Sequence, residues 1–199
     1  MFPFAGEVRL AHYDTLYFDT PTLRLYHDHR RRRAPRRKVR IRNYLDRDLS
    51  VLELKEKTAR GDTRKRRWTR PDGEAALTPR DRANLAETDA GLFTEGELVP
   101  VARTEFFRLT LVSPRTVERA TLDFDVTLEL RGRRRTLASF AIVEVKDAGH
   151  GQTSPLVAAV RRIGGKAVAF SKYCAAVALL GGERANTFRP ALRAFDGTP

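Results

Sequence analysis

Cysteine is nearly absent from this sequence, and long apolar runs are absent altogether. The single cysteine, Cys174, excludes a disulfide within the chain. No apolar run reaches the length needed to cross a bilayer, and the start MFPFAGEVRL lacks the basic and then apolar pattern of a secretory signal. We therefore expect a cytoplasmic protein with no membrane span in this chain.

The common sequence signals for phosphate loops, zinc sites and nucleophilic catalysis are also missing. Neither GxxxxGK(S/T) nor GxGxxG occurs, so bound phosphates would be held by side chains and not by a glycine-rich backbone. No Ser/His/Asp or Cys/His arrangement stands out. Four histidines are present without zinc-ligand spacing to Cys174: His12, His27, His29 and His150.

Positive charge is the strongest feature that is present. Lys and Arg total 38 against 25 Asp and Glu, which gives a formal net charge of +13 over 199 residues. Such a balance favours a polyanionic partner: nucleic acid, polyphosphate, a nucleotide or an anionic membrane surface. The length and an apolar fraction of 41% fit one soluble domain.

The stretch from residue 38 to 67 concentrates this charge on predicted strands. In KVRIRNY, Arg40 and Arg42 alternate with Val39 and Ile41, so a strand would place both guanidinium groups on one face. A surface strand can show the same pattern. Its repetition in the next two runs argues for a sheet with one positively charged face.

The second and third runs are SVLELKEK and the basic TRKRRW. Leu52 and Leu54 would share the apolar face of the second run, and Lys65 and Arg67 would share a face of the third. The other face of the second run carries Val51, Glu53, Lys55 and Lys57.

The remaining chain predicts further strands and several helices. Alternation predicts strands at 15–21, 99–112, 119–130 and 137–146, and capping signals predict helices at 78–90, 154–164 and 171–181. Residues 22–30 fit a short helix or a turn. Residues 1–182 would form the domain, and 183–199 show no period, so we expect a tail without regular structure.

Three features allow both a functional and a purely structural interpretation. The run RRRRAPRRK fits substrate steering and a solvated loop equally well. Lys172 begins a helix, where it would contact phosphate or merely flank a buried helix. The 119–130 strand would have an acidic face containing Asp123 and Asp125, and with Arg119 these residues fit a cross-strand ion-pair set as well as substrate contacts.

A basic sheet face with a few carboxylates has a chemical logic. Several cations can hold a chain of phosphates and stabilise charge during phosphoryl transfer, while one or two carboxylates hold a divalent metal that bridges phosphate oxygens.

Seven segments, in order, resemble the VTC domain of vacuolar transporter chaperone proteins and their bacterial relatives, within the triphosphate tunnel metalloenzymes. They are TLYFDTP, KVRIRNY, LELKEK, RKRR, RATLD, VEVK and FSKY, between about residues 13 and 180. The resemblance implies an α+β fold: an antiparallel barrel of about eight strands forming a tunnel, with helices outside and at the C-terminal end. It also implies polyphosphate synthesis from ATP with Mn²⁺ or Mg²⁺.

The same resemblance implies roles for particular residues. Glu144 is similar to the metal-binding glutamate. The phosphate-binding positions would be Arg40, Arg42, Lys55, Lys65, Arg108 and Lys172. A second tier of substrate-binding candidates comprises Arg103, Arg119, Glu53 and Lys146.

Two departures from the family pattern affect these expectations. Family members usually begin with a strand of the type RYExK, and nothing before Tyr13 matches it. Either the chain is truncated, its start was assigned late, or the barrel lacks one strand, which would leave an open edge for pairing with another chain. Ala169 stands where catalytic members of the family can carry a further lysine, so the tunnel of this chain would carry less positive charge.

Three hypotheses stay open from the sequence. The first is a polymerase that uses ATP, the second a triphosphatase of the same superfamily, and the third a module that binds polyphosphate without turnover. ATP and polyphosphate or another triphosphate are the expected partners, with a second copy or a membrane protein as a further partner. Specific nucleic-acid binding is disfavoured, because carboxylates interrupt the basic face and no stacking aromatic pattern accompanies the arginines.

Overall fold

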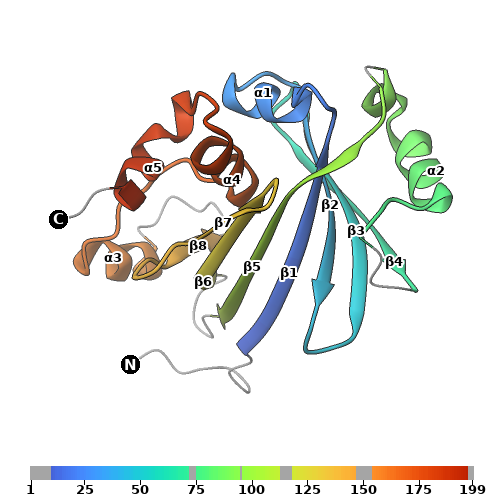
Figure 1. The fold of residues 1–199 in the computed structure, drawn as a ribbon. Helices are drawn as coiled ribbons and strands as arrows, with labels where there is room; N and C mark the ends of the chain where they lie inside the picture. Colours follow the sequence, from blue (N-terminus) through green and yellow to red (C-terminus); the bar gives the residue numbers. More distant parts are fainter. Residues whose placement is uncertain (1–9, 72–74, 95, 113–117, 147–153, 197–199) are drawn as a thin grey trace.

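The computed structural model describes residues 10–71, 75–94, 96–112, 118–146 and 154–196 (Figure 1). Within these ranges, no helix combines the length and apolar character that crossing a bilayer requires.

One antiparallel sheet of eight strands dominates the fold, and the expected α+β class is confirmed. Its order is β4-β3-β2-β1-β5-β6-β7, with β8 also paired to β6. The strands are β1 (Leu10–Asp19), β2 (Arg36–Tyr44), β3 (Leu49–Lys57), β4 (Thr63–Arg70), β5 (Val99–Val112), β6 (Arg119–Leu130), β7 (Arg133–Thr136) and β8 (Ile142–Lys146).

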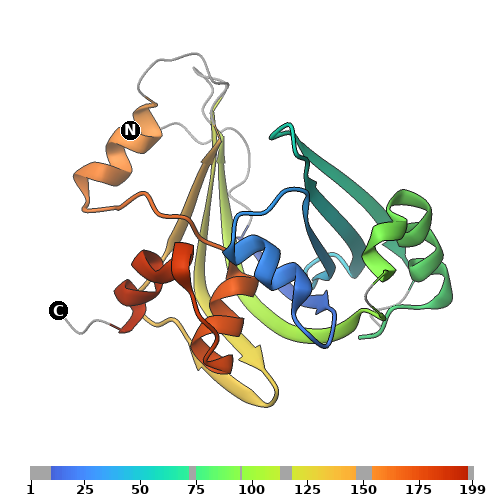
Figure 2. The same cartoon turned by 90° about the horizontal axis from the view of Figure 1, so that it is seen from above.

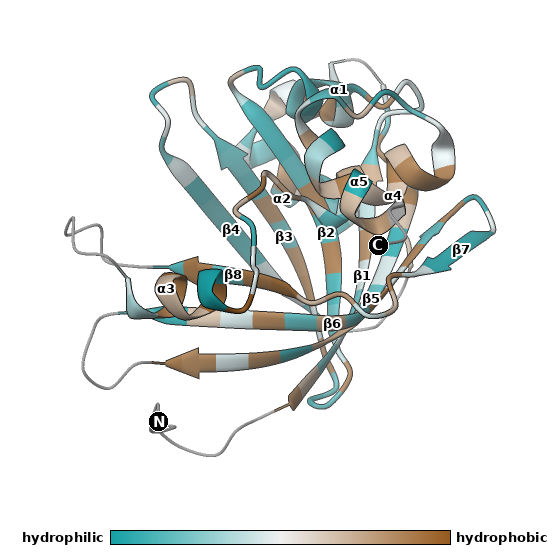
Figure 3. Ribbon diagram, turned by 90° about the vertical axis from the view of Figure 1, so that its left-hand side faces the viewer, coloured by the Kyte–Doolittle hydropathy of each residue, from teal (hydrophilic) through white to brown (hydrophobic). Residues whose placement is uncertain are grey.

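The sheet is strongly curved and has one open side among the described residues. Figure 2 shows this curvature, with β6 and β8 on one side of the bent sheet and β3 and β4 on the other; we use the word trough for the concave side of the sheet. No described strand joins β4 to β8, so a closed barrel is not formed. The edge strand β4 is largely hydrophilic (Figure 3). We call the concave surface the inner face; it carries Arg40, Glu53 and Lys65.

The outer face of β2 and β3 packs on an apolar cluster with the helices beside it. Val39, Ile41 and Leu52 are buried there against Leu85 of α2 (Pro79–Thr88) and Leu92 of the 3₁₀ turn η1 (Ala90–Phe93). Helix α2 begins with the expected capping box, in which Thr78 and Asp81 exchange hydrogen bonds. Because successive residues of a strand point to opposite faces, burial of these apolar residues on the outer face directs the charged residues of β2 and β3 to the inner face.

A second apolar cluster closes one end of the trough. Helix α4 (Lys172–Gly181) buries Cys174, Ala176 and Val177 against β5 and the second half of β6. Helix α1 (Arg24–Arg30) packs beside it through Tyr26 (Figure 1). Helix α3 (Pro155–Arg162) lies near β8, and both α3 and α4 begin at their predicted serine caps.

The acidic face predicted for the whole of β6 is wrong for its second half. Asp125 has a φ of 49°, and the pairing of β5 with β6 shifts register between Glu105 and Phe107. A bulge of this kind reverses the faces of the residues that follow it. Thr121 and Asp123 therefore face inward, while Asp125 does not continue that row.

Two other predictions along the chain are corrected. The strand expected at 137–146 is shorter: it forms only as β8, which pairs with the first half of β6, while β7, at 133–136, pairs with the second half. The stretch from 183, expected to lack regular structure, contains η2 (Asn186–Phe188) and α5 (Arg189–Asp196) up to residue 196. Phe188, Ala191 and Leu192 are buried, so tertiary packing stabilises a segment with no clear period.

Asp19 connects the end of β1 with both α1 and α4. Its buried carboxylate accepts backbone N–H bonds from Thr20 (2.7 Å), Leu25 (2.8 Å) and Tyr26 (2.8 Å), and the Tyr173 hydroxyl donates to the same group. Burial raises the pKa of Asp19, and the four hydrogen bonds partly offset this effect. The carboxylate therefore holds the helical end of the trough on the sheet.

Asp19→Asn is expected to lower the free energy of unfolding by about 2–4 kcal/mol. The N–H₂ group of the new amide would face backbone N–H and hydroxyl donors that now bind the carboxylate, so some of these hydrogen bonds would be lost. Denaturant unfolding measures the change. The exposed Asp62 provides the control, since Asp62→Asn should leave stability within about 0.5 kcal/mol. Equal stability of the two variants would contradict the role given to Asp19.

Candidate functional site: a basic face with two buried carboxylates

The registers of β1 to β4 place charged residues in rows across the inner face. Arg40 lies opposite Glu53, and Glu53 lies opposite Arg67. Two residues along the strands, Lys38, Lys55 and Lys65 form the next row. Directly opposed residues point to the same side of a sheet, so these strands present one continuous charged surface.

Glu53 is the centre of the first cluster. Its side chain is 1% exposed and pairs with four cations. We call Glu53 together with Arg40, Arg42, Lys65 and Arg67 the Glu53 cluster. Oε2 lies 2.5 Å from Arg40 Nη2 and 3.9 Å from Arg42 Nη1. Oε1 lies 2.6 Å from Lys65 Nζ and accepts from Arg67 Nε at 3.0 Å. One carboxylate therefore fixes cations from β2 and β4.

The charges of the Glu53 cluster shift each other's pKa values. Burial would raise the pKa of Glu53, but Arg40, Arg42 and Lys65 outweigh it and hold this pKa well below its usual range. Burial lowers the pKa of Lys65 from 10.5 to about 8, although Glu53 acts in the opposite direction. Glu53 is therefore ionised at neutral pH, whereas Lys65 loses its proton near pH 8.

Asp123 is the centre of a second cluster on the facing part of the sheet. Arg108 binds it with two parallel bonds, Nε to Oδ1 at 2.5 Å and Nη2 to Oδ2 at 2.7 Å, and Lys172 Nζ also contacts Oδ2. Burial opposes ionisation of Asp123, but these two cations lower its pKa overall. We call these three residues the Asp123 cluster.

Aromatic rings lie between the two clusters. Tyr13 and Phe106 stack with ring centroids 5.2 Å apart, and the Arg42 and Arg108 guanidinium carbons each lie 5.3 Å from the Tyr13 centroid. Lys172 Nζ lies 4.1 Å from the Phe106 centroid. These rings support the cations without neutralising them, which leaves the charge directed at the trough.

Tyr17 adds a polar group to the same floor. Burial would raise the pKa of its phenol, but Arg40, Arg42 and Lys172 outweigh burial and lower this pKa. The phenol thereby reports the strong positive potential of the inner face.

The structure brings the six principal candidates to the inner face. Arg40, Arg42 and Lys65 belong to the Glu53 cluster, and Arg108 and Lys172 to the Asp123 cluster. Lys55 is exposed in the row between Lys38 and Lys65.

The second-tier candidates are placed less uniformly. Glu53 is central. Arg119 and Lys146 are exposed and lie opposite each other, where β6 begins and β8 ends. Arg103 is not brought to the inner face. It lies on the opposite side and binds Asp14, with Nε to Oδ1 at 2.7 Å, because its β5 position alternates with the inward-facing Ala102 and Thr104.

Several inner-face residues were not identified from the sequence. Arg36 and Lys38 continue the alternation of Arg40 and Arg42 backwards along β2, so the period of that strand contained the signal. Arg67 was assigned the face of Lys65 without a role. Tyr17 carried no sequence signal, because its position next to the cations depends on the pairing of β1 with β2.

A divalent metal would have to be shared with a phosphate ligand. No three acidic, histidine or cysteine side chains gather as a metal site within the described part of the chain. Glu144 is exposed, and its Oε1 lies 3.5 Å from Lys146 Nζ. Glu144 is paired across the sheet with Thr121, whose buried Oγ1 finds no hydrogen-bond partner among the described residues. Mg²⁺ is often held by one or two carboxylates plus phosphate oxygens, and this arrangement fits that mode.

A curved antiparallel sheet with cations and carboxylates on its inner face is the architecture of the triphosphate tunnel proteins. The chain belongs to the VTC domain family, whose family model matches residues 7–181. Among curated proteins, none matches this chain.

A solved structure is similar in fold to this chain at low sequence identity. A Hippeastrum protein, described as an adenylyl cyclase candidate with a dominant triphosphatase activity, has a TM-score of 0.54 at 18% identity and covers 92% of this chain and 86% of its own. A Bacillus halodurans protein described as an adenylate cyclase candidate has a TM-score of 0.48 at 15% identity, covering 81% and 79%.

Lys65 is expected to titrate near pH 8, and Glu53→Gln should lower its pKa further, because the carboxylate that favours the ammonium form is lost. Carbon-13 NMR of the lysine Cε measures the midpoint. Since the pKa of Lys65 is lower in the folded chain, its contribution to the free energy of unfolding rises with pH from about 8 to 10.5.

Glu56→Gln is the matched control for that titration. Glu56 lies on the same strand with its side chain on the outer face, 3.9 Å from Arg37. An unchanged Lys65 midpoint in Glu53→Gln, or an equal shift in Glu56→Gln, would show that the Glu53 cluster is wrongly assigned.

Proposed function

We propose that this chain is a polyphosphate polymerase-type domain that transfers the terminal phosphate of ATP to a growing polyphosphate chain on the inner face. The observation that supports this most is the arrangement of six cations around only two buried carboxylates. Arg40, Arg42, Lys65 and Arg67 surround Glu53, and Arg108 and Lys172 bind Asp123. The surplus of positive charge suits a ligand with several adjacent phosphates.

The two carboxylates would act as positioning residues. Each holds an arginine and a lysine from different helices or strands in place before any phosphate arrives, so little side-chain conformational freedom remains to be lost on binding. Arg40 and Arg42 would bind phosphate oxygens from one wall of the trough, while Arg108 and Lys172 would bind them from the other.

The transfer balances without a proton acceptor. The bond between the γ-phosphorus of ATP and its bridging oxygen breaks, and its electron pair leaves with ADP. A terminal oxygen of the polyphosphate forms the new bond to phosphorus. That oxygen is already ionised near neutral pH, and the surrounding guanidinium and ammonium groups stabilise charge in the transition state.

A divalent metal fits this proposal at Glu144. Mn²⁺ or Mg²⁺ held there together with phosphate oxygens would neutralise charge on the transferring group. Thr121 lies beside Glu144 in the sheet and offers a hydroxyl oxygen to the same region.

Hydrolysis of triphosphate is the second candidate, and the open side between β4 and β8 favours it by leaving the inner face accessible to water. The Hippeastrum protein of similar fold is described as having a dominant triphosphatase activity. Against hydrolysis, a water nucleophile must lose a proton, and the lowered pKa values of Glu53 and Asp123 make both weak bases.

Purified protein incubated with ATP and Mn²⁺ is expected to release ADP and form long polyphosphate. Polymer length on gels, ADP and free phosphate are followed together. Free phosphate without polymer would replace the polymerase by the hydrolase, and tight polyphosphate binding without ATP loss would reduce the function to binding.

Arg42→Ala and Lys55→Ala are each expected to weaken tripolyphosphate binding about 10- to 100-fold, because each removes a charge-assisted contact. Calorimetric titration measures the affinity, and circular dichroism checks the fold. The exposed Arg66 provides the control, since it lies on β4 with its side chain on the opposite face from Lys65 and Arg67. Normal binding by both inner-face variants would show that this face is not the phosphate site.

A further inference from the structure

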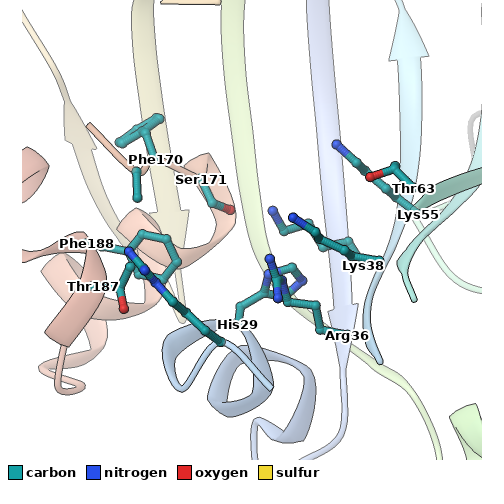
Figure 4. Close-up of a pocket in the computed structure, with 12 residues that line it drawn as sticks. His29, Arg36, Lys38, Lys55, Thr63, Phe170, Ser171, Thr187 and Phe188 are labelled. Atoms are coloured by element: carbon teal, nitrogen blue, oxygen red, sulfur yellow. The ribbon is translucent and has the colours of Figure 1, made fainter. Parts of the chain in front are cut away.

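A cavity of about 550 Å³ lies at one end of the inner face, beyond the Glu53 cluster. Its walls come from α1, the start of β2, the end of β3, the segment before α4, and η2 (Figure 4). We call it the Arg36 pocket. Six basic side chains line it: His29, Arg32, Arg36, Lys38, Lys55 and Lys57.

The charge of the Arg36 pocket differs from that of the two clusters. None of the described residues that line it carries a carboxylate, whereas Glu53 and Asp123 offset the cations elsewhere on the inner face. Burial, together with Lys38 and Arg36, lowers the pKa of His29 to about 3, so this ring is neutral at physiological pH. Arg32 and Arg36 carry permanent positive charge around this hollow, and burial lowers the pKa of Lys38 and of Lys55 beside them.

The pocket is continuous with the proposed reaction site along β2. Arg36, Lys38, Arg40 and Arg42 occupy every second position of this strand and therefore point to one face. Such positions are about 7 Å apart, so the four cations extend over about 20 Å. Lys38 is also paired across the sheet with Lys55, which belongs to both regions.

The aromatic residues at the pocket do not suit a nucleobase. Phe188 is only 6% exposed, and Phe170 packs edge-on against Phe195 with centroids 5.7 Å apart. Little ring surface is left for stacking. A ligand with a uniform chain of negative charges matches the lining better than an uncharged nucleoside.

We propose that the Arg36 pocket binds the unreacting phosphates of a polyphosphate chain, so that the chain runs along β2 from the pocket to Arg42. This assignment rests on the proposed function, because it concerns the distant part of the same substrate. It makes Arg32 and Arg36 determinants of the preference for long chains: a tripolyphosphate occupies the two clusters and extends no further than Lys55, and only a longer chain reaches Arg32 and Arg36.

Affinities for tripolyphosphate, ATP and long-chain polyphosphate at one fixed salt concentration test the assignment. The unmodified protein is expected to bind the long chain more tightly than tripolyphosphate. The double variant Arg32→Gln/Arg36→Gln should lose about tenfold in affinity for the long chain and keep its affinity for tripolyphosphate.

The same arginine run supplies a control with equal charge. Arg31 and Arg33 are exposed and do not line the pocket, so Arg31→Gln/Arg33→Gln should retain the preference for long chains. Equal losses in the two double variants would reduce the effect to net charge and overturn the assignment. A loss confined to ATP would assign the pocket to the nucleoside and also overturn it.

Arg42→Ala separates this assignment from the proposed function. Unchanged tripolyphosphate affinity in both Arg42→Ala and Lys55→Ala would overturn the inner face as the reaction site. If Arg42→Ala weakens every phosphate ligand while Arg32→Gln/Arg36→Gln weakens tripolyphosphate as much as the long chain, the separate pocket is overturned and the reaction site stands.

Discussion

The pairing of Glu53 with four cations is the interaction on which the rest of the inner face depends. Removing a carboxylate from water costs several kcal/mol, and only close, well-oriented counter-charges offset that cost. Arg40 and Arg42 come from β2, and Lys65 and Arg67 from β4, so the burial of one acid fixes three neighbouring strands in one register. In return, Glu53 reduces the mutual repulsion of cations that would otherwise lie side by side.

Apolar packing on the opposite surface supplies the energy that this arrangement needs. Val39, Ile41, Leu52 and Leu54 alternate with the charged residues and are almost fully buried under α2 and η1. The hydrophobic contribution of such side chains is about 1.5–3 kcal/mol each. The outer face of these strands therefore stabilises the fold, while the inner face of the same strands carries the charged site.

Much of this could be predicted from the sequence, because the alternation of β2 and β3 is local information. Arg40, Arg42, Glu53 and Lys55 were placed on one face from spacing alone, and the capped helices were identified by their serines and threonine. Asp123 stayed ambiguous and Asp125 was misplaced, because a bulge depends on a pairing of β5 with β6 that no local pattern records. The partners of Arg103 and Tyr17 likewise depend on strands distant in sequence.

Helix α4 contributes to the apolar core through Cys174 and Val177 and to the charged face through Lys172, its first residue. During synthesis, the walls of the trough emerge long before this helix. Until α4 docks, Asp123 lacks one of its two counter-ions and the floor near Phe106 lacks its cap. The order of translation thus makes the Asp123 cluster form late, when the C-terminal helices pack on the finished sheet.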